Sequence, residues 1–150
     1  MWNSRTNVLA TPSDVIHALT APEAIRRWSP VDFDLEDHEC RALEEGCVAR
    51  VVGRVAGVGV AFDVEVTAAD YERLSLTASG PVTLDVDYAI APAGDEVEVE
   101  ARVDVRGGRG LTGGLVAGAV RTLLSAGALD GALRRIATEA ETRATYAVAA

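Results

Sequence analysis

Residues 10–30 read ATPSDVIHALTAPEAIRRWSP, and this stretch predicts two short helices in tandem. Asp14 and its neighbours can cap the start of the first helix, after which apolar residues recur one turn apart. Thr20 is a candidate cap for the second helix, whose first turn accommodates Pro22. We expect this second helix to end before Pro30, because the residue that precedes a proline disfavours the helical conformation.

After Pro30 apolar and polar residues alternate, which predicts strands with one buried and one solvated face. The clearest strand places five apolar side chains on one side: Val58, Val60, Phe62, Val64 and Val66. Similar patterns predict five or six strands between residues 31 and 105, after a short first strand near residues 4–9. The short links between them predict an antiparallel meander. On the solvated face we expect Arg50 and Arg54 to lie between acidic neighbours on the flanking strands.

Glycine and apolar residues dominate the C-terminal third of the chain. Residues 107–114 predict a flexible joint, and the helical spacing that follows predicts one long helix as far as about Glu141. Its glycines cost about 1 kcal/mol each relative to alanine, so we expect a close approach to the sheet or room for a ligand. A membrane span is not expected here, because Arg121 and Asp130 would be costly inside a bilayer.

These elements predict an α+β fold in one domain, residues 1–150, with the last helix on the apolar face of a curled antiparallel sheet. A sheet that curls around one helix cannot close tightly along its whole length. We therefore expect an apolar cavity between this helix and the sheet, of the kind that takes hydrophobic small molecules.

The composition restricts the partners. The chain has 150 residues, of which 49% are hydrophobic and 25% are charged, as is typical of a globular domain. Its 14 basic residues are all arginines and stand against 23 acidic residues, which gives a net charge of −9. This charge has the wrong sign for a phosphate backbone, so we expect no nucleic-acid partner. A homodimer is compatible with the sequence.

Residues 1–10 contain no apolar stretch of the length that a signal peptide requires, so we expect a cytoplasmic protein. Cys40 and Cys47 would then remain thiols. A zinc site made by these cysteines and His38 would lack a fourth ligand, and its spacing matches no standard zinc pattern. The segment 107–110, GGRG, departs from the dinucleotide-binding pattern. We therefore expect neither a metal nor a cofactor.

The segments that carry a family resemblance are Ala10-Thr11-Pro12-Ser13-Asp14-Val15, Ala18-Leu19-Thr20, Pro22-Glu23 and Trp28. Together with the order of elements they resemble the SRPBCC superfamily, also called START-like, Bet v 1-like or polyketide cyclase/dehydrase. The chain departs from the family pattern at Ile16, where an aromatic residue is usual, and at Ala21, where an aspartate is frequent. The resemblance implies a helix-grip fold, in which a curved antiparallel sheet of about seven strands wraps around a long C-terminal helix, with two short helices after the first strand. It also implies a pocket for lipids, sterols, polyketides or other apolar ligands.

Strand parity and a position on the facing long helix give most of the expected ligand-binding residues, namely Phe33, Phe62, Leu84, Val86, Tyr88, Leu115, Ala119 and Leu123. Trp28 joins them because it ends the second helix beside Pro30. Trp28 can either gate the cavity mouth or anchor the second helix to the sheet. The weak catalytic candidates are Tyr88, His17 and Arg121, which could orient a carbonyl or enol, exchange a proton, or bind a carboxylate or enolate. No nucleophile with an adjacent base and no paired carboxylates accompany them.

Three functions remain open from the sequence. The first is binding of a hydrophobic small molecule between the long helix and the sheet. The second is a polyketide cyclase or dehydratase activity in the same cavity, which would require the three catalytic candidates to converge. The third resembles the branch of the superfamily that is associated with carbon monoxide dehydrogenase, whose members help to recruit a partner enzyme. An exposed apolar patch on the final helix would favour this third function.

Overall fold

The arrangement of helices and strands is given by a computed structural model, which describes residues 1–29, 32–38, 43–55, 57–108 and 110–149. The elements in chain order are β1 (Trp2–Val8), α1 (Pro12–Thr20), α2 (Pro22–Trp28), β2 (Phe33–His38), β3 (Val48–Val55), β4 (Val58–Ala69), β5 (Arg73–Ser79), β6 (Thr83–Ala93), β7 (Glu96–Arg106), α3 (Gly110–Ser125) and α4 (Ala128–Ala149).

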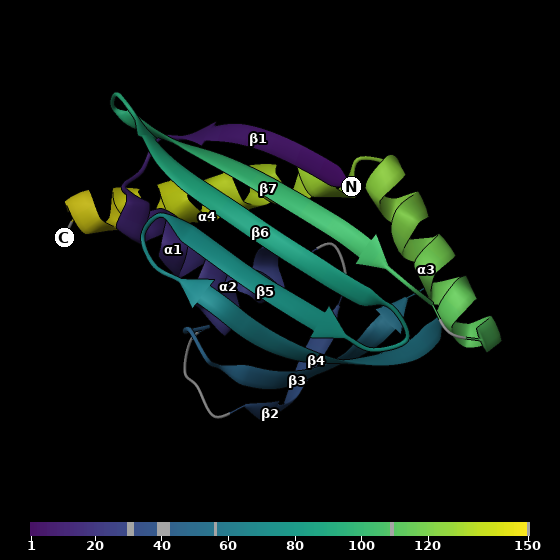
Figure 1. Cartoon of the computed structure of the whole chain (residues 1–150). Coiled ribbons are helices and arrows are strands. Elements are labelled where there is room, and N and C mark those ends of the chain that lie inside the picture. The colour runs from purple at the N-terminus through teal and green to yellow at the C-terminus, as the bar shows by residue number, and fades with distance from the viewer. Residues whose placement is uncertain (30–31, 39–42, 56, 109, 150) are drawn as a thin grey trace.

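The sheet has seven strands in the order β1-β7-β6-β5-β4-β3-β2, and neighbouring strands are antiparallel. The meander and the helix-grip arrangement expected from the sequence are therefore confirmed. Figure 1 shows α1, α2 and α4 together on one face of the curved sheet, while α3 stands at its end. The opposite face carries ion pairs, among them Arg50 with Glu36 at 3.2 Å and with Asp63 at 3.7 Å. The expected charge pairing around Arg50 is thus confirmed.

The first turn of α1 is closed by a capping box. The Thr11 hydroxyl oxygen accepts a hydrogen bond from the Asp14 backbone N–H at 3.2 Å, and the Asp14 carboxylate accepts one from the Thr11 backbone N–H at 3.1 Å. The expected cap at Thr20 is wrong. Its hydroxyl donates to the Ile16 carbonyl at 2.6 Å, and Ala21 occupies the N-cap position of α2 without a side-chain cap.

The C-terminal helix is broken, which corrects the prediction of one continuous helix. The axes of α3 and α4 meet at 63°. Gly127 lies at the break with φ of 93°, a backbone conformation that L-residues with a side chain rarely adopt. Among the described residues no single helix is both long and apolar enough to cross a membrane, and only the bent pair α3 and α4 together reaches that length and composition.

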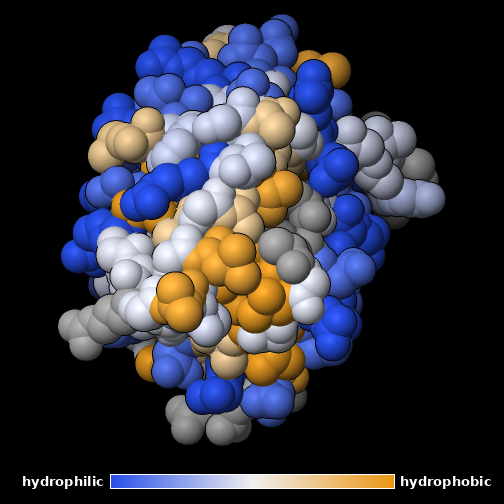
Figure 2. Space-filling model, turned by 90° about the vertical axis from the view of Figure 1, so that its right-hand side faces the viewer, coloured by the Kyte–Doolittle hydropathy of each residue, from blue (hydrophilic) through white to orange (hydrophobic). Residues whose placement is uncertain are grey.

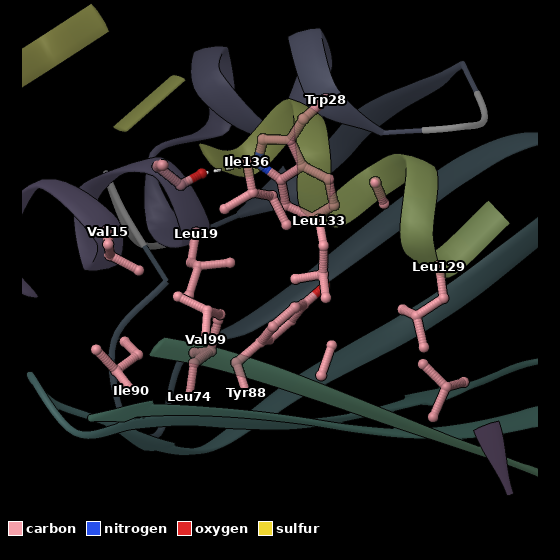
Figure 3. Close-up of a cluster of buried hydrophobic side chains, with 14 of the residues drawn as sticks. Val15, Leu19, Trp28, Leu74, Tyr88, Ile90, Val99, Leu129, Leu133 and Ile136 are labelled. Atoms are coloured by element: carbon pink, nitrogen blue, oxygen red, sulfur yellow. Dashed lines mark hydrogen bonds between the residues drawn. The ribbon is translucent and has the colours of Figure 1, made fainter. Parts of the chain in front are cut away.

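Buried side chains of α4 form part of the core between the helices and the sheet. Leu129, Leu133 and Ile136 of α4 are buried together with Leu19 of α1 and Val99 of β7. Figure 3 shows these side chains lying between the helices and the sheet. α4 packs mainly on β1 and α1, so the region of the sheet near β2 lies beyond its reach.

One glycine of α3 explains how this helix is attached. A Cβ on Gly113 would lie 2.9 Å from the Pro81 carbonyl oxygen and 2.8 Å from the Gly108 carbonyl carbon. Gly113 therefore permits a close approach, as expected for at least one of these glycines. The outer side of α3 is uncovered, since Leu111 is 95% and Leu115 is 56% exposed. Figure 2 shows apolar side chains gathered on this side of the molecule.

Candidate functional site: an apolar cavity beneath α2

An apolar cavity of about 250 Å³ lies between α2 and the part of the sheet that runs from β2 to β6. Its lining residues are Leu19, Pro22, Ile25, Trp28, Ser29, Phe33, Leu35, Leu43, Ala49, Val51, Val64, Leu74, Leu76, Val86 and Tyr88. None of these described lining residues is charged. The strand residues reach the cavity because alternate side chains of a strand point to the same face.

Trp28 both anchors α2 and forms a wall of the cavity. Its indole Nε1–H donates a hydrogen bond to the Ala18 carbonyl oxygen at 2.7 Å, which ties the end of α2 to α1. Its ring meets the Tyr88 ring edge-on, with centroids 6.5 Å apart and planes at 75°. Figure 3 shows the two rings approaching each other from α2 and from the sheet. The indole N–H is therefore already satisfied, and the ring offers an apolar surface.

Tyr88 projects from β6 into the space below Trp28, and its hydroxyl end points away from the sheet toward Leu133 (Figure 3). The side chain is only 7% exposed, and its hydroxyl makes no hydrogen bond to any residue that the structure describes. Among the described residues, no side-chain nitrogen or oxygen is both fully enclosed and without a hydrogen-bond partner. The unpaired Tyr88 hydroxyl is therefore not fully enclosed, and it borders open space. Burial raises the pKa of Tyr88 above its ordinary value, which keeps the hydroxyl protonated.

A second, smaller cavity of about 170 Å³ adjoins the first one near β2, β3 and β4. Both cavities are lined by Ser29, Phe33 and Val51, and the second also touches Phe62. Gly53 permits the close approach of β2 here, because a Cβ on it would lie 2.8 Å from the Asp32 carbonyl oxygen. The two cavities adjoin along β2 and β3, and the charged residues Asp32 and Arg54 border the second one.

Arg26 links α2 to β2 beside the cavity. Its guanidinium lies 5.7 Å from the centre of the Phe33 ring, and its Nη1 lies 3.7 Å from the Asp34 carboxylate. A cation over an aromatic face is attracted by the ring quadrupole. Arg26 therefore holds the lining residue Phe33 in place from the outside.

The structure brings together some of the residues expected at the site. Trp28, Phe33, Val86 and Tyr88 line the main cavity, and Phe62 lines the adjoining one. Leu84 is partly buried against the core and lines neither of them.

The three candidates on α3 lie elsewhere, which corrects their expected position opposite the strand residues. Leu115 is 56% and Leu123 is 41% exposed, and Ala119 packs partly against the core. The bend at Gly127 turns α3 away from the cavity. The inward side chains of α4 fill their own space against β1 and α1, so the cavity lies beneath α2 and not beneath the long helix.

Several lining residues are not among the predicted site residues, namely Leu19, Pro22, Ile25, Ser29, Leu35, Leu43, Ala49, Val51, Val64, Leu74 and Leu76. The strand residues in this set follow the same alternation that identifies Phe33 and Tyr88. That alternation identifies the side chains that point inward. It does not show which of them border a cavity and which pack against another side chain.

The three catalytic candidates do not share a site. His17 borders a charged groove between α1 and α4, where Arg143 lies 3.4 Å from Asp14 and Arg27 lies 2.6 Å from Glu139. Partial burial, then the charges of Arg143 and Arg27, lower the pKa of His17 below its usual 6.5. Arg121 is exposed on α3, whereas Tyr88 is buried in the apolar cavity.

The two cysteines and the possible metal ligand His38 differ in how far the structure describes them. Cys47 is disulfide-bonded, so the expectation that it remains a thiol is wrong. Cys40 and the backbone that follows His38 lie outside the described residues, as does the side chain of His38. Among the residues that the structure describes, no group of three or more histidine, cysteine or acidic side chains is placed to hold a metal ion.

Comparisons with known proteins agree with this fold. TTHA0849 from Thermus thermophilus is 17% identical with a TM-score of 0.69, covering 95% of this chain and 97% of that one. CV1439 from Chromobacterium violaceum is 18% identical with a TM-score of 0.65, covering 93% and 97%. Ara h 8.0201 is 14% identical with a TM-score of 0.59, covering 91% and 97%.

No curated protein matches the sequence. Residues 3–141, however, match the family described as "Polyketide cyclase / dehydrase and lipid transport". This match spans the two tandem helices, all seven strands, α3 and most of α4. The chain therefore belongs to the polyketide cyclase / dehydrase and lipid transport family, and it has the Bet v 1-like helix-grip fold.

Proposed function

We propose that this chain binds a hydrophobic small molecule in the cavity beneath α2. The observation that carries the proposal is the uncharged lining of that cavity, to which five strands, α2 and Leu19 of α1 contribute. Apolar pockets with few polar groups are the usual sites for small hydrophobic ligands. The family description, which names polyketides and lipids, supports the same class of ligand.

We favour binding over the alternative cyclase or dehydratase activity. Such an activity needs an acid or a base within hydrogen-bond reach of the bound molecule. Tyr88 borders the cavity, but His17 lies in the groove between α1 and α4, and Arg121 is exposed on α3. The separation of the three candidates supports a role in holding a molecule.

The test fills the cavity and measures uptake of a neutral hydrophobic dye, N-phenyl-1-naphthylamine, by its fluorescence. Val51 lines the cavity, whereas its neighbour Val52 points to the opposite face of β3. We expect V51W to abolish the fluorescence increase and the matched control V52W to retain it. A49L is a milder filling variant in case the tryptophan impairs folding. Equal dye binding by wild type and by folded filling variants would contradict the proposal.

A second candidate function is an interaction role, which the uncovered outer face of α3 favours. We propose a second copy of this chain as the partner. Residues 110–120 carry no charge, whereas the chain as a whole carries −9, so two copies can meet there with the least like-charge repulsion. Leu111 and Leu115 supply exposed apolar surface on that face.

Light scattering over a range of protein concentrations tests this association. Leu115 and Val48 are exposed to almost the same degree, 56% and 57%, but lie on different elements. We expect the wild type and V48K to double in mass as concentration rises, and L115K to remain a single chain. A wild type that stays monomeric, or an L115K variant that still dimerises, would rule out this interface.

A further inference from the structure

We infer that the molecule bound beneath α2 is compact and uncharged, and that it accepts a hydrogen bond from the Tyr88 hydroxyl. This inference rests on the proposed function and adds the chemical class of the ligand.

The lining of the main cavity disfavours a charged ligand. None of its described residues carries a charge that could compensate one on the ligand. Burying an unpaired charge costs far more than apolar contacts return, so an ionised group would have to stay outside. The net charge of −9 further disfavours anions near the chain.

The polar groups of the lining single out Tyr88. Three described lining residues carry a polar hydrogen on the side chain, namely Trp28, Ser29 and Tyr88. The Trp28 N–H is bound to the Ala18 carbonyl, and Ser29 has an interaction of its own. The Tyr88 hydroxyl is buried, borders the cavity and has no partner among the described residues. Because this hydroxyl borders the cavity without a partner among the described residues, it is available to donate a hydrogen bond to a ligand oxygen placed there.

The direction of this hydrogen bond follows from the state of the hydroxyl. A tyrosine hydroxyl carries its proton at neutral pH, and burial raises the pKa of Tyr88 further, so this group can act as the donor. The matching ligand group is a carbonyl, an ether or a hydroxyl oxygen. The Trp28 ring, which meets Tyr88 edge-on, provides an adjacent apolar face for a flat ligand.

The volume limits the size of the ligand. The main cavity measures about 250 Å³ and the adjoining one about 170 Å³. Sites for drug-sized molecules span about 300–1,000 Å³, and the main cavity alone lies below this range, so it suits a compact molecule of two or three fused rings.

The experiment compares three tricyclic probes by displacement of N-phenyl-1-naphthylamine at pH 7. Fluorene has no acceptor, 9-fluorenone adds a carbonyl, and 9-fluorenone-4-carboxylate adds a negative charge. We expect wild type to bind fluorenone about fivefold more tightly than fluorene, which is the usual effect of one hydrogen bond. We expect the carboxylate to bind at least tenfold more weakly than fluorenone.

Y88F removes the hydroxyl and keeps the ring, so it should bind fluorenone and fluorene equally, with fluorene affinity unchanged. Y71F alters an exposed tyrosine outside the cavity lining and should behave as wild type. A fluorenone preference that persists in Y88F, or tight binding of the carboxylate, would overturn the inference and leave the proposed function standing. Failure of wild type to bind either neutral probe would overturn the proposed function itself.

Discussion

Thr11 and Asp14 show how a single pair of residues fixes the entrance to α1. Each side chain satisfies the backbone N–H of the other, so two of the unpaired donors at the helix start find partners. The same helix carries Leu19 into the cavity lining and supplies the Ala18 carbonyl that holds Trp28. The positions of Leu19 and Trp28 at the cavity therefore depend on this cap, although neither Thr11 nor Asp14 lines the cavity.

T11A removes the side-chain half of the cap and should lower the free energy of unfolding by about 1 kcal/mol. Urea denaturation followed by circular dichroism measures the change. S13A is the matched control, because Ser13 is exposed in the same helical turn and is not part of the box. Equal stability of the two variants would show that the box contributes nothing.

At the scale of elements, the strands are predictable from the sequence because their alternation is local. The pattern of Val58, Val60 and Val66 specifies an inward face wherever the strand pairs, and β4 includes all of these residues. The C-terminal helices are harder to predict. Apolar residues keep their helical spacing through Gly127, so periodicity alone cannot reveal a bend. A glycine at the break, where φ is positive, is the local signal that the sequence offers.

Two glycines four residues apart should respond to alanine in opposite directions. Gly127 has φ of 93°, so G127A forces a side chain into a disfavoured conformation and should destabilise the protein by roughly 1–2 kcal/mol. Gly131 lies inside α4, and no atom lies within 4 Å of the position that a Cβ would take there. G131A should therefore stabilise the protein by about 0.5–1 kcal/mol.

Thermal and urea unfolding of both variants measure the two effects. Each variant serves as the other's control, because the chemical change is the same. Stabilisation by G127A would mean that α3 and α4 form one straight helix in solution.

At the scale of the whole molecule, the helices cover the two edge strands of the sheet, β1 and β2, unequally. α4 packs on the edge strand β1, whereas the edge strand β2 borders the apolar cavity. The sequence could predict the fold and an apolar sheet face that extends to both edge strands. It could not predict which of the two edge strands would be covered by packed side chains. That depends on where α4 lies after the bend and on how far Ile136 and Leu133 reach.

This difference should appear in amide hydrogen exchange. Both β1 and β2 are edge strands with one neighbour, so their ladders are comparable, but β1 is supported by α4. We expect amides of β2 to exchange faster than those of β1, because local opening is easiest where buried contacts are few. Saturation with N-phenyl-1-naphthylamine should slow exchange in β2 and leave β1 unchanged. Equal exchange of the two strands would contradict an uneven core.

The bend at Gly127 has a consequence for how this chain can diversify. No described residue of α3 or α4 lines the cavity, and the uncovered leucines of α3 belong to a different surface. Substitutions at sites without shared contacts generally combine additively. The proposed ligand binding and the proposed association of two copies can therefore be altered one at a time, by selection or by protein engineering, with little effect of one on the other.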